Sequence, residues 1–142
     1  MSQQDDNIAM VRRYFEQGVS QGNNGVIDAT VAKNYVSHHN DPVGLPPGPE
    51  GVKQFVAGTR SAFSEFKVTV GDIFAEGDKV AAWWTMQGIN TGTFFGNPAT
   101  GKPAAWQGVV ILRVANGMIA EDWYSFDQLS LLMQLGAIPS PG

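Results

Sequence analysis

The hydrophobic pattern changes its period near the middle of the chain, and this change restricts the fold more strongly than any other feature. In the first half, apolar residues recur at the spacing of a helix, as Ile8, Val11, Phe15 and Val19 do. From Phe66 onward, apolar residues instead fill segments separated by turn residues, which is typical of strands. Helices followed by a series of hairpin-connected strands predict an α+β domain.

The expected helices are marked by their ends. The first follows the acidic residues 5–6, whose charges suit a helix N-terminus, and a short second helix covers about residues 26–33. Pro49 followed by an acid begins the third helix. The last helix carries the leucines of 129–135 and stops at Gly136.

Strands are expected in the remaining segments. Residues 41–48 and 93–103 are loops, and Asn116-Gly117 is a strong signal for a hairpin turn. In the longest strands, neither the odd-numbered nor the even-numbered residues form a polar set. We therefore expect one face of the sheet to pack on helices and the other to meet a second sheet or a subunit. The expected strands are 35–39, 66–75, 79–91, 104–114 and 118–124.

Length and charge content indicate one domain with part of its surface covered. The chain has 142 residues, which fits a single domain over 1–142 with a core at about 8–139. Charged residues make up only 15% of the sequence, whereas about a quarter is usual. A subunit interface or a ligand cavity would each cover surface that carries charge in a monomer.

Charge and composition exclude several classes of function. The formal net charge is −4 and no basic cluster exceeds Arg12-Arg13, so nucleic acid is not expected as a partner. No apolar run is long enough to span a membrane, and the polar N-terminus is unlike a signal peptide, so we expect a cytoplasmic protein. Cys is absent, which excludes disulfides and thiolate chemistry. The elbow of serine hydrolases and the glycine-rich loops that bind dinucleotides or phosphate are also missing.

Residues 88–102 read Gly-Ile-Asn-Thr-Gly-Thr-Phe-Phe-Gly-Asn-Pro-Ala-Thr-Gly-Lys, and the features around them keep a distinctive order. The turn Asn116-Gly117 and the leucine-rich segment 129–139 follow this stretch, and a Tyr-Val-Ser-His segment at 35–38 precedes it. In these features the sequence resembles the SnoaL-like polyketide cyclase family, over about residues 8–139.

The resemblance implies a cone-shaped, curled antiparallel sheet packed on N-terminal helices around an apolar pocket, as in ketosteroid isomerase, and a homodimer. Family members close a ring in a polyketide ester by intramolecular aldol condensation, without metal or organic cofactor. An acid near the last strand is their acid/base, and Asp127 is the matching position. Where the family often has His, this chain has Asn90, which cannot exchange a proton near neutral pH. The chemistry can therefore be lost or altered.

Asp127 has two interpretations. An aldol closure needs a base for a C–H next to a carbonyl and then an acid for the oxygen, and one carboxyl in a dry pocket can serve as both. Equally, residues 125–128 have the spacing of a capping box, so Asp127 can be a first-turn acid that stabilises a helix dipole.

His38 and His39 are the only histidines in the chain. On a strand they point to opposite faces, so they cannot ligate one metal together, and no metal site is expected. The resemblance favours His38 as the inward residue, where it would exchange a proton or hold a substrate carbonyl. The alternative is a half-buried histidine that bonds to a backbone carbonyl.

Further candidates for the pocket come from strand parity. Asn90 shares its parity with Trp84 and Met86, so the three are expected on the inward face. Asn90 would then donate to an enolate or carbonyl oxygen; otherwise it is a turn residue that begins the loop. Trp123 and Tyr35 are candidates for the pocket wall, with packing in the core as their alternative.

Gln107 is a further candidate for the cavity from the neighbouring strand, and Trp83, of opposite parity, is expected on the second sheet or subunit face.

Two hypotheses for function follow from these residues. The first hypothesis is an enzyme that closes a ring in a hydrophobic, carbonyl-bearing small molecule, with isomerisation, dehydration or epoxide opening as related tasks of the fold. The second is a non-catalytic, dimeric domain that binds a small molecule.

Overall fold

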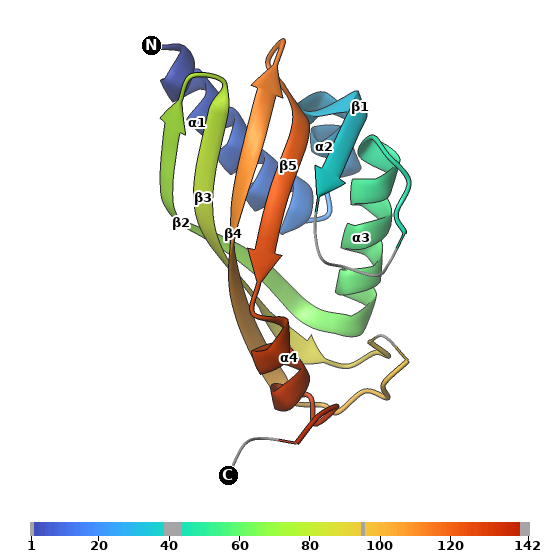
Figure 1. Ribbon diagram of the computed structural model, residues 1–142. Helices are drawn as coiled ribbons and strands as arrows, with labels where there is room; N and C mark the ends of the chain where they lie inside the picture. The colour runs from blue at the N-terminus through green and yellow to red at the C-terminus, as the bar shows by residue number, and fades with distance from the viewer. Residues whose placement is uncertain (1, 39–43, 95, 140–142) are drawn as a thin grey trace.

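The computed structural model describes residues 2–38, 44–94 and 96–139. Helices and a five-stranded sheet make up the domain, with one helix between the first strand and the other four and a short helix after the last strand (Figure 1), which confirms the expected α+β class. No helix in these ranges has the length and apolar character needed to cross a membrane. The elements in chain order are α1 (Gln3–Arg13), the π-helix η1 (Tyr14–Val19), α2 (Asn24–Thr30), β1 (Val31–His38), α3 (Pro49–Ala62), β2 (Phe63–Glu76), β3 (Lys79–Asn90), β4 (Pro103–Ala115), β5 (Met118–Phe126) and α4 (Gln128–Gln134).

Local sequence sets the helix ends. The Ser2 hydroxyl accepts a hydrogen bond from the Asp5 N–H, and the Asp5 carboxylate accepts one from the Ser2 N–H, so a capping box begins α1. Asn23 caps α2, and α3 has Pro49 in its first turn as expected. The second helix is shorter than expected, because the backbone becomes extended at Val31 and enters β1.

The π-helix η1 continues α1 and turns two adjacent aromatic side chains into the protein. Tyr14 and Phe15 are both buried, together with Val11 in α1 and Val19 at the end of η1. The two rings meet edge to face, with their centroids 4.9 Å apart, and both point into the same interior.

The sheet has the strand order β1-β5-β4-β3-β2. Strands β2 to β5 form the expected antiparallel meander, with Gly77 and Gly117 in positive-φ conformations at two hairpin turns. One pairing differs from the antiparallel sheet that was expected: β1 pairs with β5 in parallel. No hairpin joins this pair, because α3 and strands β2 to β4 lie between β1 and β5 in the chain.

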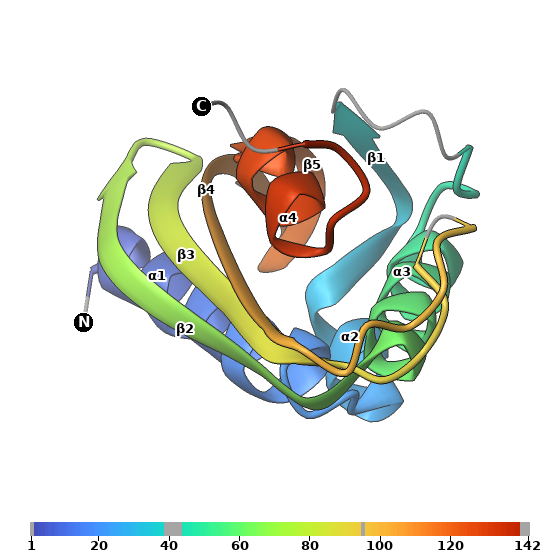
Figure 2. The same ribbon diagram turned by 90° about the horizontal axis from the view of Figure 1, so that it is seen from below.

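The two faces of the sheet have different environments. The long strands curl, and β1 and β2 remain the edges of the sheet in the described part of the chain (Figure 2). The N-terminal helices cover one face, where the even-numbered residues of β3 are buried as their parity predicts. Among the described residues no second sheet covers the other face, and Trp83, Val109 and Ile111 are exposed there.

A bulge in β5 changes which of its side chains face inward. Where β4 advances by one residue, β5 advances from Ile119 to Glu121, so Ala120 is an extra residue in the strand. After an extra residue, each following side chain of the strand points to the opposite face of the sheet from the one that regular alternation predicts. Ile119 and Ala120 are therefore both buried. Beyond the bulge, the residues that line the interior are Asp122, Tyr124 and Phe126.

Gly108 lies on β4 between β3 and β5. A Cβ atom at this position would come within 2.6 Å of Trp84 Cζ2 and 2.8 Å of Phe126 Cβ. We predict that Gly108→Ala lowers the free energy of unfolding by about 1–3 kcal/mol, because the core must shift to accept the methyl group. Urea denaturation followed by circular dichroism measures this change.

The matched control for this prediction is Gly71→Ala in β2. The nearest atom to a Cβ at Gly71 is the Trp83 carbonyl oxygen, at 3.4 Å, which is an ordinary contact. The unfolding midpoint of Gly71→Ala should equal or slightly exceed that of the parent, since alanine restricts the unfolded chain. Equal midpoints for the two variants would contradict the close packing at Gly108.

Candidate functional site

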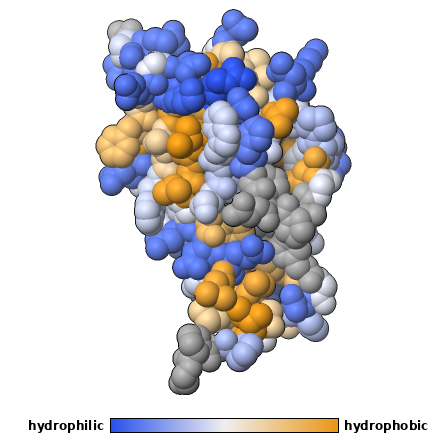
Figure 3. All heavy atoms as spheres, in the orientation of Figure 1, coloured by the Kyte–Doolittle hydropathy of each residue, from blue (hydrophilic) through white to orange (hydrophobic). Residues whose placement is uncertain are grey.

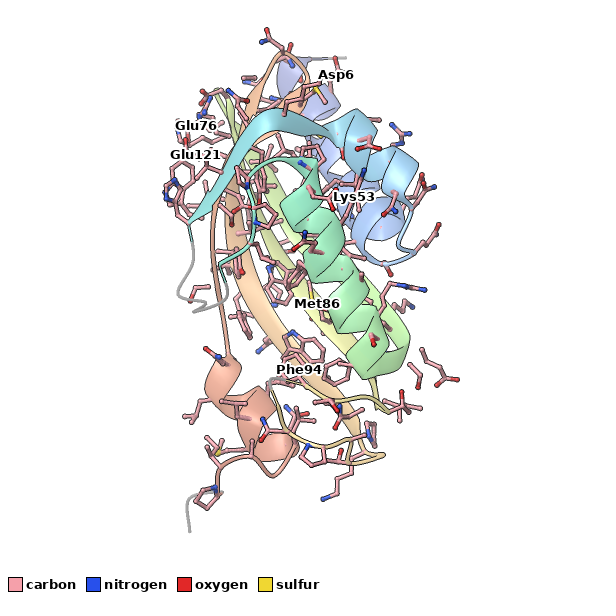
Figure 4. The ribbon with its side chains drawn as sticks, turned by 90° about the vertical axis from the view of Figure 1, so that its right-hand side faces the viewer. Asp6, Lys53, Glu76, Met86, Phe94 and Glu121 are labelled. Carbon is pink, nitrogen blue, oxygen red and sulfur yellow. The ribbon has the colours of Figure 1, made fainter. Side chains whose placement is uncertain are left out.

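A cavity of about 590 Å³ lies between the inner face of the sheet, η1 and α3. Its volume falls within the usual range of small-molecule sites. Most of its wall is aromatic or aliphatic, with Phe15 from η1, Trp84 and Met86 from β3, and Trp106 from β4. Figure 4 looks onto α3 and shows Met86 and Phe94, both wall residues, beside this helix.

A buried carboxylate faces this cavity. Asp122 on β5 lines the wall and is only 5% exposed. The Tyr35 hydroxyl donates to its Oδ2 at 2.6 Å, and the Ser37 hydroxyl donates to its Oδ1 at 2.5 Å. Both donors come from β1, whose parallel pairing sets Ser37 directly beside Asp122. These hydrogen bonds replace water around the buried carboxylate and fix its position.

Tyrosine hydroxyls near Asp122 remain protonated. Burial raises the pKa of Tyr35 far above its ordinary value, and the neighbouring Asp122 carboxylate, which accepts the Tyr35 hydrogen bond, raises it further. Burial likewise raises the pKa of Tyr14, with a smaller contribution from the charge of Asp122. A neutral phenol is a hydrogen-bond donor. This end of the cavity therefore combines a carboxylate with neutral hydroxyl donors.

Strand parity explains which of the expected wall residues reach the cavity. Tyr35, Trp84 and Met86 line it. The two residues of β3 do so because β3 pairs with β4 without a register shift, so its alternation is regular. Gln107 does not line it: Trp106 on the same strand faces inward, and the next residue is therefore exposed on the outer face.

Asp127 lies outside the cavity, which corrects the pocket position expected for it. Strand β5 ends at Phe126, and Asp127 is the N-cap of α4. Its Oδ1 accepts a hydrogen bond from the Ser130 N–H at 3.0 Å, and the residue is exposed. The structural interpretation, an acid that stabilises the first turn of a helix, describes this position.

His38 and Trp123 also lie outside the cavity, on the outer face of the sheet, where their rings stack at a centroid distance of 5.3 Å. His38 points outward because Ser37, before it on β1, points inward. Trp123 is on the outer face because the bulge at Ala120 reverses the parity of β5. His39 lies outside the described residues. Among those that are described, no three His, Asp or Glu side chains gather closely enough to hold a metal ion.

Asn90 is buried, as its parity predicts, but it is not part of the cavity wall. Its Nδ2 donates to the carbonyl oxygens of Ala62 at 3.2 Å and Gly92 at 2.9 Å. Its Oδ1 accepts from the Thr100 N–H at 2.9 Å and from the Thr100 hydroxyl at 3.0 Å. The donors and acceptors of the amide are thus all used. Asn90 joins both ends of the loop after β3 to the end of α3, which fits its interpretation as a residue of the loop.

Sequence reasoning missed Asp122 and Ser37, the two residues that define the polar end of the site. One signal for Asp122 was present, because the neighbours Ile119 and Ala120 are both apolar, as on either side of a bulge. Adjacent apolar residues also occur in regular strands that are covered on both faces. The two apolar neighbours therefore could not locate the bulge, so the residues of β5 that face inward could not be identified from the sequence.

Comparison with known proteins assigns the chain to a family. Residues 9–135 match the model of the SnoaL-like polyketide cyclases, and the chain belongs to this family. TsrD from Streptomyces laurentii is similar in structure, with a TM-score of 0.86 and 25% identity over 97% of this chain and 99% of its own. IdmH, a candidate polyketide cyclase from Streptomyces antibioticus, is 30% identical, with a TM-score of 0.74 over 95% of this chain and 99% of its own.

A more distant neighbour shows the fold alone. It is a hypothetical protein with a ketosteroid isomerase-like fold from Catenulispora acidiphila, solved with trimethylamine. It is 19% identical, with a TM-score of 0.73 over 89% of this chain and 92% of its own. No curated protein matches the sequence. The expected family and the ketosteroid isomerase-like fold are confirmed.

Asn90→Ala tests the anchoring of the loop. We predict that it lowers the free energy of unfolding by about 2–3 kcal/mol, because buried groups around residue 90 lose their hydrogen-bond partners. Amide hydrogen exchange near Thr100 should become faster in the same variant. Gln87→Ala, at an exposed position of the same strand, is the control and should change stability by less than about 0.5 kcal/mol. Similar stabilities and exchange rates in both variants would rule out this role of Asn90.

Proposed function

We propose that the protein is an enzyme that closes a ring in a hydrophobic, carbonyl-bearing substrate by an intramolecular aldol reaction, with Asp122 as acid and base. The observation that carries the proposal is the buried Asp122 carboxylate in a cavity whose wall is otherwise largely apolar. Family membership supports the reaction class, since IdmH is a candidate polyketide cyclase. The proposal moves the acid/base role from Asp127 to Asp122, because Asp127 caps a helix outside the cavity.

The proposed reaction begins with a proton transfer. The Asp122 carboxylate removes a proton from a substrate carbon next to a carbonyl group, and the C–H electron pair becomes that of an enolate. The enolate carbon attacks a second carbonyl carbon of the same molecule, so a C–C bond forms and the carbonyl electrons move to its oxygen. This alkoxide takes the proton back from Asp122. Substrate and product are isomers, so the atom and electron balance needs no oxidant or reductant.

The hydroxyl groups near Asp122 suit two supporting roles. Tyr14 stays protonated because its pKa is raised, so its hydroxyl is suited to donate to an oxygen that gains charge. Tyr35 and Ser37 also hold the carboxylate in one orientation. The apolar walls strengthen these interactions because they keep water away.

The bonding of Asp122 also supports a second candidate function. Each carboxylate oxygen accepts a hydrogen bond from a protein hydroxyl, which suits a purely structural carboxylate equally well. The cavity would then belong to a non-catalytic domain that binds a small molecule. An isomerase, dehydratase or epoxide hydrolase would instead keep the acid and base and act on another substrate.

We predict that Asp122→Asn lowers the rate of ring closure by about 10²–10⁴-fold, because an amide cannot take up and return a proton. A panel of polyketide methyl esters serves as substrate, and chromatography of ester and cyclic product measures turnover. Asp127→Asn is the matched control. Asparagine caps a helix about as well as aspartate, so its turnover and thermal stability should stay close to those of the parent.

The possible outcomes separate the two candidate functions. Retained turnover in a folded Asp122→Asn variant, or lost turnover in a folded Asp127→Asn variant, would contradict the role proposed for Asp122. If the parent binds the esters but converts none of them, the non-catalytic binding domain is favoured.

We also propose that the chain forms a homodimer through the outer face of its sheet. Trp83, Val109, Ile111 and Trp123 are 37–46% exposed and occupy paired positions on β3, β4 and β5. Figure 3 shows hydrophobic residues on the sheet side of the molecule, among hydrophilic ones. Contiguous apolar patches of this kind often mark an interaction surface.

A charged cluster borders this face. The Arg113 Nε donates to Glu121 Oε1 at 3.0 Å, and His38 Nε2 lies 2.7 Å from Glu121 Oε2. The hydrogen bond from Arg113, followed by that from His38, lowers the pKa of Glu121. The acid is therefore ionised and paired beside the apolar residues, which is the usual composition of an interface rim.

We predict that Trp83→Lys raises the dimer dissociation constant by at least about tenfold, because it replaces a large apolar side chain of the proposed contact with a charge. Size-exclusion chromatography with light scattering, over a dilution series, measures the molar mass. Leu129→Lys is the control, because Leu129 is 61% exposed but lies on α4, away from the sheet face. A monomeric parent, or a Trp83→Lys variant as dimeric as the control, would refute the proposed interface.

A further inference from the structure

Gly58 lies in the middle of α3, and neither close packing nor an unusual backbone conformation requires glycine at this position. Glycine weakens a helix interior relative to alanine. A Cβ atom at Gly58 would meet no described heavy atom within 4 Å, and the φ angle of Gly58 is not in the left-handed region. Gly51 in the same helix differs, since a Cβ atom there would collide with the carbonyl oxygen of Pro46. A side chain would thus fit at residue 58 of α3, but the glycine at this position has none.

Gly58 borders the cavity where the cavity opens to solvent. It belongs to the wall and is nevertheless exposed. It comes three residues after Phe55 and four before Ala62, so a side chain at residue 58 would lie on the same side of α3 as these two residues, which face the protein interior. Gln54, one turn earlier, is also an exposed wall residue. The opening therefore follows this side of the helix.

Gly58 and the carboxylate of Asp122 lie toward different ends of α3. The N–H of Gly48, just before the helix, donates to the Tyr35 carbonyl oxygen at 2.8 Å, and the Tyr35 hydroxyl donates to Asp122. Ten helical residues span about 15 Å, so Gly58 is about that far from Gly48 along the helix axis. Figure 4 shows Phe94 near the C-terminal end of the helix. A ligand that touches Asp122 and extends to Gly58 must therefore be elongated.

We propose that Gly58 is a specificity-determining position, whose missing side chain makes room for the far end of an elongated, flat, uncharged ring system. The inference rests on the proposed function, in which the other end of this substrate meets Asp122. An uncharged ligand fits because the wall is largely apolar and its described residues include no Lys, Arg or His to pair with an anion. The Asp122 carboxylate already accepts hydrogen bonds from Tyr35 and Ser37. Flat rings fit because aromatic side chains such as Trp84 and Trp106 form much of the wall.

Binding of linear quinones tests the inference without any need for turnover. The probes are 1,4-naphthoquinone, 9,10-anthraquinone and 5,12-naphthacenequinone, which differ in length by one ring each. Quenching of tryptophan fluorescence reports binding, because Trp84 and Trp106 are in the wall. For Gly58→Leu, we expect the Kd of the longest quinone to rise at least about tenfold and that of the shortest to change less than about twofold. Ala57→Leu, at the exposed neighbouring position outside the wall, should leave all three Kd values unchanged.

Gly58→Ala separates a role in binding from a role in folding. Alanine favours the helix, so the Tm should rise by about 2–4 °C. The Kd of the longest quinone should rise less than in Gly58→Leu, because the methyl group fills less of the opening. A Tm below that of the parent would show that the fold requires glycine at this position, and would overturn the inference.

The remaining outcomes distinguish this inference from the proposed function. If Gly58→Leu and the parent bind all three quinones equally, the specificity role of Gly58 is refuted and the proposed reaction at Asp122 is unaffected. If the parent binds none of the quinones, the substrate class proposed for the cavity is refuted and this inference with it. If quinone selection changes in Gly58→Leu while Asp122→Asn keeps its turnover, only the catalytic proposal is lost.

Discussion

Tyr35 and Ser37 donate hydrogen bonds to the buried carboxylate of Asp122 and so join the first strand of the chain to the last. Removing a carboxylate from water costs several kcal/mol, roughly, unless donors compensate for the lost hydration. Both donors, Tyr35 and Ser37, belong to β1, which is not part of the meander and pairs with β5 in parallel. The contact therefore joins the edge strand to the sheet and orients a carboxylate in the cavity. The backbone of Tyr35 makes a separate contact, since its carbonyl oxygen accepts a hydrogen bond from the N–H of Gly48 just before α3.

Two departures from regular secondary structure make this arrangement possible. The extra residue Ala120 reverses the parity of β5 and turns Asp122 inward. The π-helix η1 carries Tyr14 and Phe15, and both of them line the same cavity. A regular β5 would have directed Glu121 toward the interior, and Asp122 would have faced solvent. The polar end of the cavity is thus a product of irregularities that simple periodicity cannot represent.

The other end of the cavity is organised by backbone geometry and shape, not by charge. Asn90 ties the loop after β3 to the end of α3, and Phe94 of this loop packs on Phe63 with ring centroids 5.3 Å apart. Gly58 leaves the wall of α3 without a side chain at the opening. Chemistry and selection of ligand length can therefore depend on different residues, so either can change while the other is kept.

Features that depend on neighbouring residues could be predicted from the amino-acid sequence. Pro49 begins α3, and the regular alternation of β3 directs Trp84 inward, because such signals act within one turn or one strand. Contacts between distant segments set the parallel pairing of β1 with β5 and turn Asp122, but not Asp127 or His38, toward the cavity. The partners of Asp122 lie 85 and 87 residues away along the chain, and a one-residue bulge determines whether they meet. Local periodicity contains no information about either condition.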